Sequence, residues 1–290
     1  MCQEASKRIV IMTIDDGGDT SAFQSISEIV IKYGIDATNV KIPKGGVSDQ
    51  QLHDVLYDST GNPKYKALVF PNGRISFNNG GQWKSAITDS QWETIYEYSR
   101  TYGSRVVFLN EYPSIYTGTK IPEDLINSNN VNVYTSQQTI TAAPGSQYAD
   151  IINTANLNTY NIYHFPAIIE NTQNVTAQPL LYFEPNSSYG EKTVAAVEVD
   201  YAGAKFSAYH MAFGQWSKTS KTLNILWISW ATELDLKTLS SSEITTEEAL
   251  KENSINASPS SPSLSDAGRN RKLEMLFVTL STLFSIFYFF

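Results

Sequence analysis

The chain has 290 residues, a formal net charge of -8 and a pI of about 5.0. This acidic balance excludes the basic surface that binding to nucleic acid requires, so we expect no nucleic-acid partner. The single cysteine, Cys2, excludes a disulfide within the chain, so the fold depends on its core, for which 41% hydrophobic residues are sufficient.

The first hundred residues alternate between apolar runs and segments with helical spacing. Residues 8–14 read RIVIMTI, which is typical of a buried parallel strand. Apolar side chains from Phe23 to Tyr33 recur on one helix face, and Gly34 ends that helix. The same alternation predicts further strands at residues 37–42, 65–70 and 105–109.

Two capping boxes mark the starts of further helices. In each, a Ser or Thr is followed three residues later by a Gln, whose side chain bonds back to the backbone of the capping residue. Ser48 with Gln51 begins a short helix, and Thr88 with Gln91 begins a longer helix that Gly103 ends.

This alternation predicts an α/β fold, a Rossmann-like doubly wound parallel sheet. The order of strands and helices is similar to that of class I glutamine amidotransferases. Residues 114–210 are interpreted as an antiparallel β-rich insertion. Residues 217–232 return to helical spacing and place Trp227 and Trp230 in the core. The strand-like stretches of the insertion are residues 131–134, 160–169, 180–183, 193–199 and 205–210.

Composition divides the chain into four parts. Residues 1–6 are a short N-terminal tail, and residues 7–238 form the α/β domain with its β-rich part at 114–210. Residues 239–272 are rich in Ser, Glu, Asn and Pro, and we expect them to form a disordered stalk. Residues 273–290 are a hydrophobic C-terminal tail with one charge near its start.

The C-terminal tail has the layout of a glycosylphosphatidylinositol (GPI) anchor signal. Small residues begin at Ser265, the expected anchor residue, and a short polar spacer then leads into the tail. A tail-anchored membrane helix is the alternative. Residues 1–6 do not have the pattern of a secretory signal peptide, so we also expect the true transcript to begin upstream of Met1.

Three Asn-x-Ser/Thr sequons agree with an extracellular location. They predict N-linked glycans at Asn174, Asn186 and Asn256. Together with the tail, they predict a protein at the cell surface or in the cell wall that is anchored to the membrane by its C-terminus.

One motif suggests enzymatic chemistry. Residues 13–17, Thr-Ile-Asp-Asp-Gly, are similar to the Thr-Phe-Asp-Asp-Gly motif of NodB-type polysaccharide deacetylases. Those enzymes also bind a metal through two histidines spaced His-x-x-x-His, whereas His53, His164 and His210 are far apart in this sequence. The turn at residues 70–73 lacks the cysteine that amidotransferase chemistry requires. We therefore expect no catalytic residue, no metal and no cofactor.

Aromatic and amide side chains are concentrated in the predicted loops. Aromatic rings stack on the apolar faces of sugars, while amides and carboxylates hydrogen-bond to sugar hydroxyls. The carboxyl ends of parallel strands also meet at one sheet edge, where open α/β sheets bind ligands. We therefore predict a carbohydrate site formed by Asp15, Asp16, Asn72, Trp83, Asn110, Glu111, Tyr112 and Trp216.

Two longer segments carry a resemblance to a known family. Residues 80–92 read GGQWKSAITDSQW, and residues 216–232 read WSKTSKTLNILWISWAT. With Tyr102–Val107 and Tyr112-Pro113, they resemble the amino-terminal region of fungal galactosaminogalactan deacetylases over roughly residues 7–235. The resemblance implies a carbohydrate-binding module. In that family a metal-dependent deacetylase domain follows, whereas here the similarity ends just after Trp230.

The sequence therefore supports one hypothesis and two alternatives. We expect a non-catalytic cell-surface protein that binds a galactose- or galactosamine-containing polysaccharide of a fungal wall. The first alternative is a metal-dependent polysaccharide deacetylase that uses Asp15 and Asp16. The second is a structural or adhesion protein of the wall without a defined sugar site.

Overall fold

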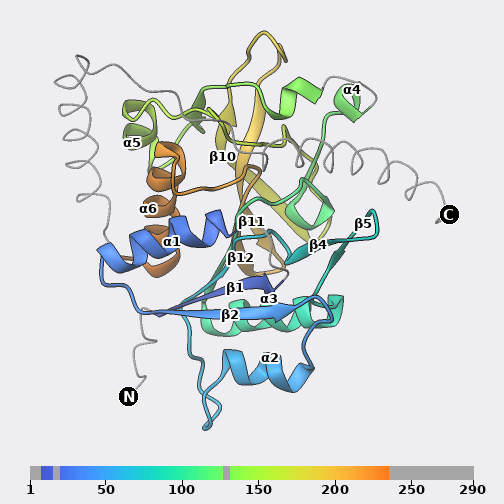
Figure 1. Cartoon of the computed structure of the whole chain (residues 1–290), viewed down its shortest axis with the longest axis vertical. Coiled ribbons are helices and arrows are strands. Elements are labelled where there is room, and N and C mark those ends of the chain that lie inside the picture. Colours follow the sequence, from blue (N-terminus) through green and yellow to red (C-terminus); the bar gives the residue numbers. More distant parts are fainter. Residues whose placement is uncertain (1–7, 16–19, 127–130, 235–290) are drawn as a thin grey trace.

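The computed structural model describes residues 8–15, 20–126 and 131–234 (Figure 1). Eight strands of these segments form one sheet in the order β2-β1-β3-β6-β12-β11-β10-β8. The parallel strands are β2 (Ala37–Pro43), β1 (Ile9–Asp15), β3 (Ala67–Phe70), β6 (Arg105–Phe108) and β12 (Ala204–Tyr209). The antiparallel strands that follow are β11 (Thr193–Tyr201), β10 (Val175–Phe183) and β8 (Ile140–Ala142).

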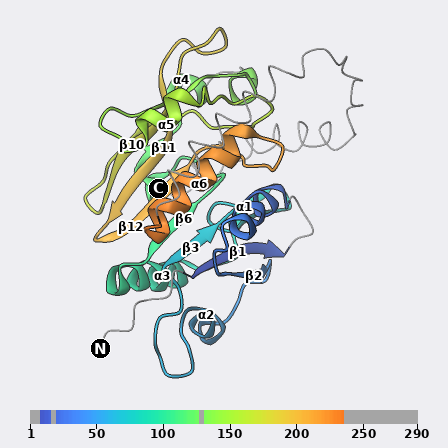
Figure 2. The ribbon, with the colours of Figure 1, turned by 90° about the vertical axis from the view of Figure 1, so that its left-hand side faces the viewer.

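Helices cover both faces of the sheet (Figure 2). The helices α1 (Ser21–Lys32) and α6 (Lys218–Thr232) pack on one face, and α2 (Asp49–Leu56) and α3 (Asp89–Tyr102) pack on the other. Because successive side chains of a strand point to opposite faces, each parallel strand contributes to two cores. Ile9 belongs to the core beneath α1 and α6, and its neighbour Val10 belongs to the core beneath α2 and α3.

Shorter elements complete the described part of the chain. A hairpin of two strands stands apart from the main sheet, and a second small pair lies near the antiparallel strands. These elements are β4 (Ser76–Asn79), β5 (Gln82–Ser85), β7 (Thr119–Lys120), β9 (Ile168–Ile169), α4 (Glu123–Ile126), α5 (Ala149–Thr154) and the 3-10 turns Ile115–Thr117 and Val131–Tyr134.

Both predicted capping boxes are present. The N–H of Gln51 donates to Ser48 Oγ at 3.2 Å, and the Gln51 side chain accepts from the N–H of Ser48 at 2.8 Å. Thr88 and Gln91 make the same reciprocal pair at the start of α3. Gly103 follows α3 with a φ of 62°, a left-handed conformation that glycine adopts without steric cost. The predicted starts of both helices and the predicted end of α3 are thereby confirmed.

The expected Rossmann-like doubly wound sheet in the order of class I glutamine amidotransferases, with a separate antiparallel insertion, is wrong. β12 pairs parallel with β6, and the antiparallel strands continue from it in the same mixed sheet. The pattern of apolar and polar residues in the sequence indicates which residues of a strand are buried, but it does not indicate which strand is its neighbour in the sheet. Residues 131–134 are a 3-10 turn, and only Ile168–Ile169 of the expected strand 160–169 is extended into a strand.

Helix α6 is buried along nearly its whole length, and Trp227 and Trp230 lie in the core as predicted. Asn224, which is fully buried, connects α6 to α1. Its Nδ2 donates to Ser25 Oγ at 2.6 Å, and its Oδ1 accepts from Trp227 Nε1 at 2.8 Å. One amide thus provides partners for two other buried polar groups, which the interior of a protein requires.

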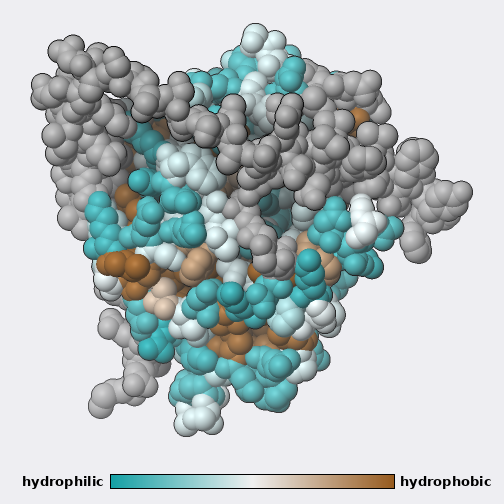
Figure 3. Space-filling view, in the orientation of Figure 1, coloured by the Kyte–Doolittle hydropathy of each residue, from teal (hydrophilic) through white to brown (hydrophobic). Residues whose placement is uncertain are grey.

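On the face shown in Figure 3, hydrophobic side chains gather over α1 and between β2 and α2. Of the residues whose structure is described, none forms a helix that is long and apolar enough to cross a membrane. The predicted N-terminal tail, stalk and C-terminal tail lie outside the described residues, as do Asn256 and Ser265.

We expect Asn224→Ala to lower the free energy of unfolding by about 1–3 kcal/mol, because it leaves the Ser25 hydroxyl and the Trp227 indole N–H buried without a partner. Urea denaturation followed by circular dichroism measures this change. Lys221→Ala alters an exposed position of the same helix and should change the value by less than about 0.5 kcal/mol. Equal stabilities of Asn224→Ala and the unmodified protein would contradict this role of the amide.

Candidate functional site

Two loops at the carboxyl ends of the neighbouring strands β6 and β12 are joined by their backbones. The N–H of Asn110 donates to the carbonyl of Met211 at 3.1 Å, and the N–H of Glu111 donates to the carbonyl of Tyr209 at 2.9 Å. Asn110 has a φ of 56°, a left-handed conformation in which Asn is enriched. Strand pairing therefore places residues 109–118 beside residues that follow β12.

A third segment, residues 158–165, lies alongside the loop that follows β12. The N–H of Phe165 donates to the carbonyl of His210 at 2.8 Å. The N–H of Asn158 donates to Thr219 Oγ1 at 3.2 Å, and that hydroxyl donates to the Asn158 carbonyl at 2.7 Å. The third segment is thus attached both to the end of β12 and to the first turn of α6.

Residues 109–118, 158–165 and 210–217, hereafter the aromatic loops, carry several exposed rings. The exposed fractions are 48% for Tyr112, 42% for Tyr116, 65% for Tyr160 and 54% for Trp216. An aromatic ring has a flat apolar face and, in Tyr and Trp, a polar group that hydrogen-bonds. The aromatic loops therefore offer stacking surfaces to a ligand at one region of the sheet edge.

Packing against the protein holds several of these rings in place. Tyr112 packs edge-to-face against Phe165, with 5.2 Å between the ring centroids. The Trp216 ring lies over Gly214, where an added Cβ would come within 2.3 Å of the indole. The backbone of Gly214 thus supports the indole directly, and a side chain at this position would displace it.

The guanidinium of Arg74 packs against one face of the Tyr116 ring. The guanidinium carbon lies 3.9 Å from the centroid of Tyr116 and 4.7 Å from that of Trp92, so the cation is held between two aromatic faces. The guanidinium also donates to the Tyr96 hydroxyl at 2.8 Å. One face of Tyr116 is therefore occupied by Arg74.

Glu111 is buried near this arginine. Gly73 lies so close that an added Cβ would come within 2.4 Å of Glu111 Oε2. Burial raises the pKa of Glu111 to about 7, although the charge of Arg74 and a hydrogen bond from the Arg74 backbone N–H act in the opposite direction. This carboxyl group therefore changes its charge near neutral pH.

Two of the three histidines are buried, and they stabilise the protein interior. His210 Nδ1 lies 2.9 Å from the carbonyl oxygen of Glu111, and His164 Nε2 lies 2.7 Å from Gln138 Oε1. Burial lowers the pKa of both histidines to about 4, so both are neutral at pH 7. His53 lies on α2, and the described residues contain no group of three His, Cys, Asp or Glu side chains suited to a metal ion.

The structure brings most of the predicted site residues to the same sheet edge. Asn72 lies in the turn after β3, and the next residue, Gly73, donates its N–H to the carbonyl of Leu109 at 2.8 Å. This bond places the turn beside the first aromatic loop. Asn72, Asn110, Glu111, Tyr112 and Trp216 therefore lie in neighbouring turns and loops of one edge.

The other predicted residues lie elsewhere. Asp15 ends β1, two strands away from β6, and is paired with Lys41 at 3.7 Å. Trp83 is 45% exposed but lies on the β4–β5 hairpin, on the opposite side of the molecule from α6 in Figure 1. Asp16 lies outside the described residues.

Sequence reasoning missed Tyr160 and Arg74. Residues 160–169 were expected to be a strand, although Asn158 and Asn161 flank Tyr160 and are typical of turns. Asn161 has a left-handed φ of 56°, as such a turn requires. Arg74 carries no comparable pattern, because arginine is mostly found at protein surfaces.

A family model that describes a carbohydrate-binding module matches most of the chain. It is the model for Agd3 CBM87, and it matches residues 5–230; the chain therefore belongs to the Agd3 CBM87 family. This result confirms the resemblance found in the sequence and establishes a carbohydrate-binding role. No curated protein matches the sequence.

The chain is also similar to the crystal structure of Agd3, described as a novel carbohydrate deacetylase, with a TM-score of 0.62 and 27% identity. The match covers 79% of this chain and 32% of that chain, so this protein spans about a third of the deacetylase structure. A β-galactosidase from Rahnella sp. R3 has a TM-score of 0.43 at 10% identity, covering 78% of this chain and 31% of that chain. A ThuA-like protein from Bacteroides uniformis has the same TM-score at 8% identity, covering 78% and 90%.

The raised pKa of Glu111 predicts a stability that decreases as the pH rises. From about pH 4.5 to 7 the unfolded chain releases this proton while the folded chain keeps it, which lowers the free energy of unfolding by on the order of 3 kcal/mol. Glu111→Gln cannot ionise and lacks this component. Urea denaturation of both proteins from pH 4.5 to 8 should show their difference in stability changing by about this amount, whereas a constant difference would contradict the assignment.

Proposed function

We propose that this protein is a non-catalytic carbohydrate-binding protein that binds a sugar polymer through the aromatic loops. The observation that carries the proposal is the arrangement of Tyr112, Tyr160 and Trp216 as exposed rings on three segments joined by hydrogen bonds. The Agd3 CBM87 family defines the general role, and these rings supply the chemistry for it. Each ring can stack on the apolar face of a sugar unit.

Polar groups near the rings complete the set that a saccharide requires. Burial raises the pKa of Tyr112 to about 12, so its hydroxyl keeps its proton and remains a hydrogen-bond donor at neutral pH. Asn72 and Asn110 lie at the same edge and have amide side chains, which donate and accept. We place the sugar rings against the aromatic faces and their hydroxyls toward these groups.

The polymer that we propose is a galactose- or galactosamine-containing polysaccharide of a fungal cell wall. Support comes from the resemblance to galactosaminogalactan deacetylases and from the similarity to the structure of Agd3, which is described as a carbohydrate deacetylase. Binding to a panel of immobilised polysaccharides, including glucans and mannans, tests the choice. Equal binding to all of them would contradict it.

We also propose that the protein does not catalyse a reaction. The matched family model covers a binding module, and Asp15 of the candidate deacetylase motif is paired with Lys41 at 3.7 Å. Metal-dependent release of acetate from an acetylated hexosamine polymer, abolished by Asp15→Asn, would support the deacetylase alternative and overturn this part. Failure to bind any polysaccharide would favour a structural or adhesion role.

We further propose that the protein is displayed at the cell surface by a GPI anchor attached at Ser265. The layout of small residues, polar spacer and hydrophobic tail in residues 265–290 supports this location. In this arrangement residues 239–264 act as a spacer between the membrane and the binding domain.

We expect Trp216→Ala to weaken binding to an immobilised galactosamine-containing polysaccharide by about 1 kcal/mol, or roughly fivefold in Kd, because a stacking face is lost. Trp83→Ala removes an equally large and similarly exposed ring that lies outside the aromatic loops, and should leave Kd unchanged. Thermal denaturation checks that both variants remain folded. Unchanged binding by a folded Trp216→Ala protein would contradict the proposed site.

Phosphatidylinositol-specific phospholipase should release the protein from intact cells that express the full-length transcript. Retention of the protein on the cells, with residues 273–290 still detectable, would favour a tail-anchored helix.

Glycopeptide mass spectrometry of the released protein should find Asn174 occupied, since it is exposed. Asn186 should be much less occupied, because its Nδ2 donates to Ser136 Oγ at 3.0 Å and to the Gln137 carbonyl at 2.9 Å.

A further inference from the structure

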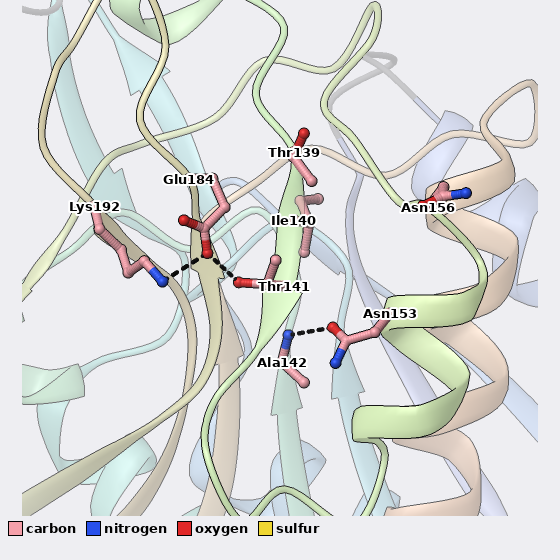
Figure 4. Close-up of a pocket in the computed structure, with 8 residues that line it drawn as sticks. All are labelled: Thr139, Ile140, Thr141, Ala142, Asn153, Asn156, Glu184 and Lys192. Atoms are coloured by element: carbon pink, nitrogen blue, oxygen red, sulfur yellow. Dashed lines mark hydrogen bonds and ion pairs between the residues drawn. The ribbon is translucent and has the colours of Figure 1, made fainter.

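A hollow of about 390 Å³ lies beside β8, the last strand of the sheet (Figure 4). Its wall comes from β8, from the end of α5 with the residues after it, and from the residues that follow β10 and precede β11. The polar side chains that line it are Thr139, Thr141, Asn153, Asn156, Glu184 and Lys192. We call it the side hollow.

The side chains of Glu184 and Asn153 in the side hollow are held by hydrogen bonds, but each keeps one polar atom that makes no hydrogen bond to the protein. Glu184 Oε1 accepts from Thr141 Oγ1 and is paired with Lys192 Nζ at 2.7 Å. Asn153 Oδ1 accepts from the N–H of Ala142 at 3.3 Å. Among the described residues, the other Glu184 oxygen and the Asn153 amide nitrogen have no hydrogen bond to the protein (Figure 4). They provide one acceptor and one donor to a ligand.

The charges that line the side hollow balance. Glu184 is the only acidic residue among its lining residues, and Lys192, the only basic one, is directly paired with it. Burial tends to raise the pKa of Glu184, but Lys192 and the Thr141 hydroxyl outweigh this effect and lower it, so the group is a carboxylate. A charged ligand would therefore gain no net attraction here, whereas a neutral ligand with hydroxyl or amide groups would pair with the partly used atoms.

The side hollow also has a small apolar part. Ala142, which is partly exposed, contributes a methyl group that suits the C–H face of a sugar ring, whereas the Ile140 side chain is almost fully buried in the core. Asn156 at the rim has a left-handed φ of 49°.

The side hollow is close to the aromatic loops. Asn156 lies on its rim, and Tyr160 is four residues further along, at most about 14 Å of extended chain. Between them, Asn158 bridges to Thr139 of the hollow and hydrogen-bonds to Thr219 at the start of α6. One short connection therefore contributes to both features.

We propose that the side hollow is a second binding site, which takes a neutral sugar unit of the same polymer that stacks on Tyr160 and Trp216. This inference rests on the proposed function and extends it to a chain of several sugar units. A neutral unit, such as an N-acetylated hexosamine, fits the balanced charges, whereas the cationic amine of a deacetylated unit gains no attraction at this site.

The test uses N-acetylgalactosamine oligosaccharides of increasing length and their fully deacetylated counterparts, measured by titration calorimetry on the full chain. We expect the affinity of the unmodified protein to rise with length for the acetylated series. Asn153→Ala and Glu184→Gln should each weaken binding of the long acetylated oligosaccharides about 3- to 10-fold, the effect of one lost hydrogen bond. Neither variant should change binding of the shortest oligosaccharides that the aromatic loops hold.

Glu170→Gln is the matched control, because it removes a glutamate that is paired with Lys120 at 2.9 Å and lies outside the side hollow. It should bind like the unmodified protein. If Trp216→Ala weakens binding but Asn153→Ala and Glu184→Gln do not, the second site is wrong and the proposed function stands. If none of the oligosaccharides binds even to the unmodified protein, the proposed function fails as well.

Discussion

The parallel pairing of β12 with β6 is the constraint on which the candidate site depends. Phe206, Ser207 and Ala208 lie opposite Val106, Val107 and Phe108. The two strands are separated by about a hundred residues of sequence, yet parallel pairing brings their carboxyl ends to the same edge. The loops that carry Tyr112 and Trp216 become neighbours only because of this pairing.

Contacts with α6 also hold β6 in place at its amino-terminal end. The Arg105 guanidinium donates to the Trp230 carbonyl in the last turn of α6 and lies 4.8 Å from the Trp230 ring centroid. A cation at the end of a helix also interacts favourably with the helix dipole. α6 is in turn joined to α1 by Asn224, so the strand that begins at Arg105 is held within a packed core before its loop reaches the surface.

Local structure was largely predictable from the sequence, whereas strand pairing was not. The capping boxes at Ser48 and Thr88 are short patterns whose hydrogen bonds form within four residues, and both were predicted. The placement of β12 beside β6 depends on contacts across the whole chain, which hydrophobic alternation does not contain. The same limit explains why Trp83 was included in the site, since loop aromatics look alike until the fold separates them.

Predictability within the site followed the same division. Asn72, Asn110 and Glu111 follow strands whose carboxyl ends were expected to meet, so their proximity followed from a general property of parallel sheets. Tyr160 comes from a segment outside that part of the sheet, and a hydrogen bond of the folded chain joins that segment to the first turn of α6, just after the loop that carries Trp216. Ligand-binding loops that come from such connections can be identified only once the structure is known.

The two outer strands of the sheet have a consequence for the behaviour of the protein at high local concentration. At one side, the Asn153 side chain and the Leu157 carbonyl accept the N–H groups of β8 that another strand would use. At the other side, β2 presents Lys41 and ends at Pro43, which has no N–H to donate. Both margins thus resist addition of a strand from a second molecule. Copies crowded along a repeating polymer would therefore stay separate and would not associate edge to edge into fibrils.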